Sequence, residues 1–183
     1  MTRLGRRRLV RKLSARDPAQ CWEAATALAH VDDPRTLRRV ERLLESRSND
    51  QGRAAAAYVL GFSGSADVSE ALVRRLADTD ESVLVRAHAA EALGHLLQYQ
   101  PVLAQIRTTI VSCLRDPDPE VRFWSAFAAG ALELQESRSQ LQRLMGDETE
   151  IAGWWTIAEE AGWALRCLDG EDDPPLPRPR PEA

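Results

Sequence analysis

Apolar residues recur along the chain at steps of three and four, which is the period of a helix that buries one face. One such stretch contains Leu37, Val40 and Leu44. No segment alternates apolar and polar residues between turn residues, which would be the pattern of a half-buried strand. The chain is therefore predicted to be all-α.

The helical pattern is repeated. The clear copies are DESVLVRAHAAEALGHL at 80–96, DPEVRFWSAFAAGALEL at 118–134 and DQGRAAAAYVLGF at 50–62, and weaker copies lie at 17–31 and 157–168. Aligned on their Leu-Gly step, the copies are spaced 32 to 36 residues apart. Each copy follows another amphipathic helix, so the sequence predicts five helical pairs.

Aspartate-rich breaks separate the predicted helices. Asp17-Pro18, Ser48-Asn49-Asp50 and Asp116-Pro117-Asp118 each precede a repeated helix. A short polar side chain at this place accepts hydrogen bonds from the free amides of the first helical turn. We therefore expect these residues to be N-caps.

The order Asp, Val-Arg, Ala-Ala-x-Ala-Leu-Gly resembles HEAT repeats of the bacterial phycobilisome-lyase-like type, over about residues 4 to 170. The resemblance implies a right-handed α-solenoid of about five HEAT-like helical hairpins, with the repeated helices lining a concave face. We expect residues 1–170 to form this solenoid. Residues 171–183 are rich in proline, cannot continue a helix, and are expected to be a disordered tail.

The resemblance also implies a ladder of ion pairs, because in such repeats an aspartate before the inner helix pairs with an arginine within it. The matching pairs are Asp50 with Arg53, Asp80 with Arg86, and Asp118 with Arg122.

Composition narrows the function classes. The net charge of −4 disfavours a general nucleic-acid binder, although residues 1–17 are strongly basic. Lys12 is the sole lysine, an arginine bias typical of a GC-rich bacterial genome. The three cysteines are far apart, and no stretch is long and apolar enough for a membrane span, so we expect a cytoplasmic protein.

Large aromatic and acidic side chains fall on the expected concave face. Exposed apolar surface marks interaction sites, and aromatic residues dominate binding hot spots. The favoured function is a non-enzymatic adaptor, scaffold or inhibitor, monomeric or dimeric through its end repeats, that binds a basic or apolar segment of another protein. The candidate binding residues are Tyr58, His88, Glu91, Phe123, Trp124, Phe127, Glu159, Glu160 and Trp163.

Other interpretations stay open. The aromatic rings could instead pack between helices, and HEAT folds include DNA-repair enzymes and chromophore-handling lyases. HEAT-type di-iron enzymes use adjacent His-Glu pairs, and this chain has no such dipeptide. His88, Glu91 and His95 share one helix face, but we expect no metal, no cofactor and no catalytic residues.

Overall fold

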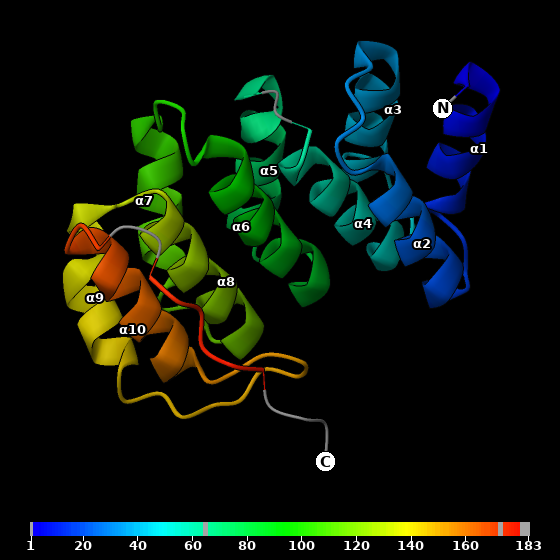
Figure 1. Cartoon of the computed structure of the whole chain (residues 1–183). Helices are drawn as coiled ribbons and strands as arrows, with labels where there is room; N and C mark the ends of the chain where they lie inside the picture. Colours follow the sequence, from blue (N-terminus) through cyan, green and yellow to red (C-terminus); the bar gives the residue numbers. More distant parts are fainter. Residues whose placement is uncertain (1, 64–65, 172–173, 180–183) are drawn as a thin grey trace. The chain divides into compact units, whose positions relative to one another are not determined.

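The computed structural model describes residues 2–63, 66–171 and 174–179. The chain divides into two compact units, Met1–Leu96 and Leu97–Ala183. The described residues contain ten α-helices and two short 3₁₀ helices (Figure 1). Their only extended pairing is an isolated bridge between Glu150 and Thr156. The prediction of an all-α, HEAT-like fold is confirmed. None of the helices in these ranges has the length and apolarity that crossing a bilayer would require.

Unit 1 contains three successive helical pairs. In chain order its helices are α1 (Arg3–Lys12), α2 (Pro18–Leu28), α3 (Pro34–Leu44), α4 (Asp50–Gly61), the 3₁₀ helix η1 (Ala66–Val68), α5 (Ser69–Ala77) and α6 (Val83–Leu97), of which only Leu97 falls outside the unit. The even-numbered helices coincide with the repeated copies in the sequence. Helices α2 and α4 lie side by side, and α3 packs on α4.

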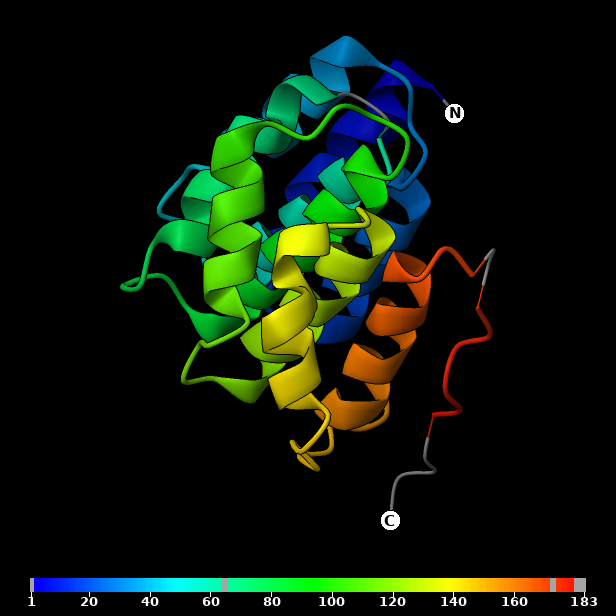
Figure 2. The ribbon, with the colours of Figure 1, turned by 90° about the vertical axis from the view of Figure 1, so that its left-hand side faces the viewer.

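Unit 2 contains two pairs. Its helices are α7 (Ala104–Cys113), α8 (Pro119–Ala131), the 3₁₀ helix η2 (Gln135–Ser137), α9 (Arg138–Leu144) and α10 (Ile157–Leu168). Helix α10 packs against both α8 and α9, and Figure 2 shows α9 and α10 side by side. A loop over residues 145–156 connects these last two helices.

Polar side chains start the repeated helices as predicted. The carboxylate of Asp17 accepts a hydrogen bond from Ala19 N at 3.1 Å, and that of Asp118 accepts one from Glu120 N at 2.9 Å. The side-chain oxygen of Asn49 accepts from Gly52 N at 2.7 Å. The breaks in the sequence therefore act as N-caps.

Small residues let the inner helices approach closely. A Cβ added at Gly61 of α4 would lie 2.8 Å from the Cα of Ala92 in α6. A Cβ at Gly130 of α8 would lie 2.7 Å from the Cα of Ala164 in α10. Both contacts are with backbone atoms, which cannot rotate away, so any larger side chain would push the helices apart.

Gly130→Ala should therefore destabilise the protein, although alanine is the better helix former. We expect a loss of about 1–3 kcal/mol in the free energy of unfolding, the usual scale for overpacking. The measurement is urea denaturation followed by circular dichroism.

Gly162→Ala is the matched control, because its Cβ would lie 3.6 Å from the Sδ of Met145, an ordinary contact. This variant should be neutral or gain up to about 1 kcal/mol from helix propensity. Equal effects of the two substitutions would contradict the close-packing argument.

Candidate partner-binding surface

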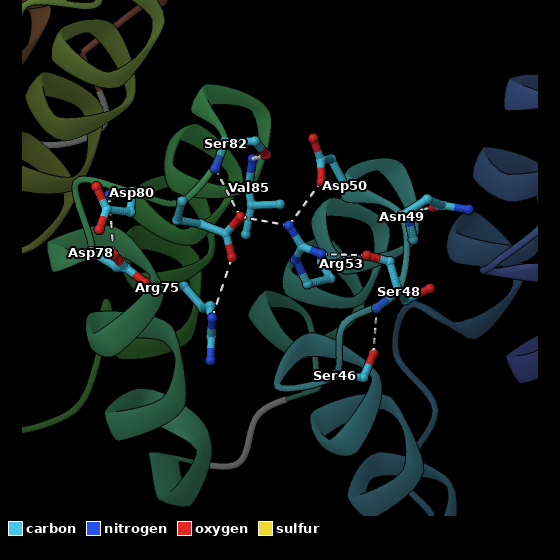
Figure 3. Close-up of polar contacts among 12 residues, drawn as sticks. Ser46, Ser48, Asn49, Asp50, Arg53, Arg75, Asp78, Asp80, Ser82 and Val85 are labelled. Carbon is cyan, nitrogen blue, oxygen red and sulfur yellow. Dashed lines mark hydrogen bonds and ion pairs between the residues drawn. The ribbon is translucent and has the colours of Figure 1, made fainter.

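A buried glutamate joins the turns of two successive repeats in unit 1. Arg53 of α4 reaches Asp50 at 2.8 Å and the Oε1 of Glu81 at 2.6 Å, and Arg75 reaches the Oε2 of Glu81 at 3.3 Å. Arg53 also donates to the carbonyl of Ser48. Figure 3 shows Arg53, from α4, and Arg75, from α5, reaching the same carboxylate. The side chain of Glu81 is only 4 % exposed, and sequence analysis did not single it out.

The surroundings of Glu81 keep it ionised. Burial by itself would raise the pKa of this carboxyl, but hydrogen bonds from Arg53 and from the amide of Ser82, with the charge of Arg53, lower the pKa below its ordinary value. The glutamate is thus a fixed negative charge between two arginines.

The predicted ladder is present in a shifted form. The Asp50–Arg53 pair forms as expected. Arg122, however, pairs with Asp147 at 2.8 Å rather than with Asp118, whose carboxylate caps α8. Arg53 of α4 thus reaches Glu81, which follows α5. Arg122 of α8 likewise reaches Asp147, which follows α9.

The two residues of the remaining predicted pair lie in different environments. Arg86 is 6 % exposed, and its Nε donates to the carbonyl of Leu76 at the end of α5 at 3.2 Å. Asp80 is exposed in the turn before α6, where its amide donates to the carboxylate of Asp78.

Aromatic side chains of α2, α4 and α6 form a continuous row in unit 1, which we call the unit 1 ring row. It consists of Trp22, Tyr58, Phe62, His88 and His95. The ring centroids of Trp22 lie 5.8 Å from Tyr58 and 5.0 Å from His88. Phe62 lies 4.9 Å from Tyr58 and 4.5 Å from His95. All five side chains are half-buried, so each keeps part of its ring accessible.

One histidine of this row is paired with a neighbouring glutamate of α6. The Nδ1 of His88 lies 2.7 Å from the Oε2 of Glu91, which is 7 % exposed. Burial lowers the pKa of His95, and the charge of Glu91 opposes that effect. Within the part of the chain that the structure describes, no three His, Cys, Asp or Glu side chains gather in a way that could hold a metal ion.

A second row, the unit 2 ring row, consists of Trp154, Trp124, Phe127 and Trp163. Phe127 of α8 stacks on Trp163 of α10 with centroids 5.6 Å apart and an angle of 14° between the planes. Trp124 lies 5.8 Å from Phe127 and 5.0 Å from Trp154. Phe127 and Trp163 are half-buried, Trp154 is 38 % exposed, and Trp124 is only 8 % exposed.

Three predicted surface residues of unit 2 are buried instead: Trp124, Phe123 and Glu160. Phe123 is 1 % exposed, because Trp154 and Trp155 of the 145–156 loop pack on it. Their ring centroids lie 6.2 and 5.9 Å from that of Phe123. Glu160 is also 1 % exposed and accepts a hydrogen bond from the indole of Trp155 at 2.6 Å. The loop preceding α10 folds over this side of the unit, which helical periodicity does not reveal.

Burial changes the charge of Glu160. Desolvation raises the pKa of this carboxyl to about 8, and the hydrogen bond from Trp155 only partly offsets it. Glu160 is therefore mainly uncharged at neutral pH and does not attract cations. Glu159 is exposed, but its carboxylate accepts a hydrogen bond from Thr156 N in a capping box. The acidic part of the predicted surface is weaker than expected.

A family model for HEAT repeats matches the sequence twice, over residues 7–94 and 79–166. None of the curated proteins matches it.

Several solved structures are similar in fold. The complex of CpcE and CpcF of phycocyanin lyase from Nostoc sp. has a TM-score of 0.68 at 18 % identity, over 93 % of this chain and 67 % of that one. An engineered protein has a TM-score of 0.58 at 22 % identity, over 92 % and 80 %. A designed armadillo repeat protein in complex with the peptide (KR)4 has a TM-score of 0.57 at 17 % identity, over 87 % and 80 %.

Glu81→Ala should lower the free energy of unfolding by about 2 kcal/mol, the scale for losing a buried, charged hydrogen-bonded partner. Since the pKa of Glu81 is lowered on folding, its contribution is present above the ordinary glutamate pKa. It should be lost as the pH falls through the lower, folded value. Thermal melts at pH 7 and pH 3 measure both effects. Glu70→Ala is the control, because the side chain of Glu70 is 75 % exposed and its carboxylate lies 3.9 Å from the guanidinium of Arg74. Similar losses of stability at both sites would refute the role of Glu81 in joining the two turns.

Glu160→Gln should make the melting temperature less dependent on pH between the ordinary glutamate pKa and about 8. The raised pKa of Glu160 means that folding favours its neutral form. Stability should therefore decrease as the pH rises from the ordinary glutamate pKa to about 8. Melting temperatures between pH 5 and pH 9 measure this slope. The exposed Glu148→Gln should leave it unchanged, and an unchanged slope in Glu160→Gln would show that Glu160 titrates normally.

Proposed function

Because the chain belongs to the family of HEAT repeats, we propose that it is a non-enzymatic adaptor, scaffold or inhibitor that binds a segment of another protein. The observation that carries this proposal is the presence of half-exposed aromatic rows on the inner helices of both units. Aromatic side chains on such helices lose little freedom when a partner covers them, so they bind at low entropic cost.

The chemistry of the rows favours an apolar or extended partner segment. Tyr58, Phe127 and Trp163 supply partly exposed ring faces. Glu91 is paired with His88, and Glu160 is buried and mainly neutral, so selection of basic residues depends on Glu159. The designed armadillo protein of similar fold is in complex with the peptide (KR)4, which supports a peptide segment as the ligand here.

A second candidate is a role in a lyase assembly. The fold likeness to the CpcE–CpcF complex of phycocyanin lyase favours it. If the chain has a role in a lyase assembly, the absorbance spectrum of an added bilin should change when the bilin binds the chain. If the chain is an adaptor for protein segments, the absorbance spectrum of the bilin should stay unchanged.

Tyr58→Ser and Phe127→Ser should each weaken binding of a partner protein by about 2 kcal/mol, or roughly thirtyfold in Kd, because each removes an anchoring ring. The partner is first captured from the native host with the intact chain, identified by mass spectrometry and purified. Calorimetric titration of the purified partner then gives the dissociation constants.

Leu103→Ser is the control, because Leu103 is 58 % exposed and lies outside both rows. It should leave the affinity unchanged. If Phe127→Ser instead lowers stability by about 3 kcal/mol or more, its ring belongs to the core and the unit 2 ring row is not a binding surface. If all three variants bind equally, the proposed function is refuted.

A further inference from the structure

Pro174 and Pro175 lie against α10. The indole Nε1 of Trp163 donates to the carbonyl of Pro174 at 3.0 Å, and the Nη2 of Arg166 donates to the carbonyl of Pro175 at 2.9 Å. Pro174 is buried. Figure 2 shows residues 174–179 running back alongside α10. Two donors, three residues apart on one helix, thus hold two successive carbonyls of the segment.

This segment has the sequence of a polyproline II ligand. Residues 174–179 read PPLPRP, with prolines at a P-x-x-P spacing from Pro174 to Pro177. Proline fixes φ near the polyproline II value, and that helix has no internal hydrogen bonds. Its carbonyls are therefore free to accept from a partner surface. The described residues of the segment have no regular secondary structure, in agreement with this conformation.

The receiving surface has the features that recognise such a helix. Trp163 is held by its stack on Phe127, and the Nε of Arg166 is 3.4 Å from the carboxylate of Glu171. Beside Pro174 lies a hollow of about 720 Å³, lined also by Gly130 and by Tyr99, which is 88 % exposed. Aromatic side chains with an indole donor and a groove between them are the usual receptor for prolines.

We propose that Trp163, Arg166 and the adjoining hollow form a binding site for proline-rich segments in the polyproline II conformation, and that residues 174–179 occupy this site within the same molecule. A partner protein carrying a P-x-x-P segment would have to displace the chain's own segment. This inference deepens the proposed function, since it names the class of segment that unit 2 takes and a contact that limits access to it.

The test compares the full chain with a full-length variant, Pro174→Ser/Pro175→Ser/Pro177→Ser, which weakens the internal ligand and leaves the site intact. The probe is a fluorescent peptide of residues 172–179, and its anisotropy is measured during titration. An internal segment acts as a competitor of about millimolar effective concentration, so the triple variant should bind the peptide about tenfold more tightly than the parent chain. A probe with the same three serines should not bind.

Two substitutions in the triple variant then locate the site. Trp163→Phe keeps a ring on Phe127 but removes the indole donor, and it should abolish most of the peptide binding. Leu103→Ser changes an exposed side chain that lies outside both ring rows, and it should have no effect. In the parent chain, hydrogen exchange of the Trp163 indole N–H should be slower than in the triple variant.

Three outcomes would overturn the proposal. The first is equal binding by the parent and triple variants, and the second is equal effects of Trp163→Phe and Leu103→Ser. The third is a concentration-dependent dimer of the parent chain in light scattering, which would place the segment on a second copy. Melting curves of each variant establish that it is folded. The probe is the chain's own sequence, so the peptide titration does not depend on a captured partner. A negative titration therefore leaves the proposed function standing, and a failed partner capture leaves the titration valid.

Discussion

In both units, a glycine near the end of one inner helix packs directly against an alanine of the next. Gly61 faces Ala92 and Gly130 faces Ala164, at distances that leave no room for a Cβ. Interiors at this density tolerate little change in volume, so the small residues set how far apart the repeats stand. The surrounding leucines and alanines can fill the space only if this spacing is kept.

The close approach also decides where the large rings can be. No ring fits at the point where two inner helices touch through glycine and alanine, and the rings of Phe127 and Trp163 beside the contact in unit 2 are half-buried. Trp163 shows the connection directly, since its ring would lie 2.9 Å from a Cβ added at Gly130. The same residue that brings α8 and α10 together makes room for the indole that stacks on Phe127 and binds the carbonyl of Pro174.

The turns between repeats carry the polar part of the architecture. Glu81 and Asp147 are drawn toward arginines of the preceding inner helix, and both carboxyls have a lowered pKa although burial alone would raise it. Glu160 is the counterexample, because its neighbours offer one indole donor and no cation, so its pKa rises. Glu81 and Asp147 thus stay charged because hydrogen bonds from Arg53 and the Ser82 amide, and from Thr149 and Arg122, outweigh burial, whereas one indole donor does not outweigh it at Glu160.

The features that depend on neighbours along the chain could be predicted from the amino-acid sequence. Helical period, Asp17 and Asp118 as caps, and the succession of five pairs all follow from contacts within a few residues, which periodicity and turn chemistry encode. The Asp50–Arg53 pair belongs to the same class, since its partners are three residues apart.

Which side of a helix stays exposed depends on long-range packing and could not be predicted. Phe123 and Glu160 were expected on the surface, yet the 145–156 loop covers one and Trp155 buries the other. Arg122 likewise takes its acid from a loop 25 residues away. Loops have no period and their paths depend on long-range packing, so neither these contacts nor the placement of Pro174 on Trp163 is encoded in any local pattern.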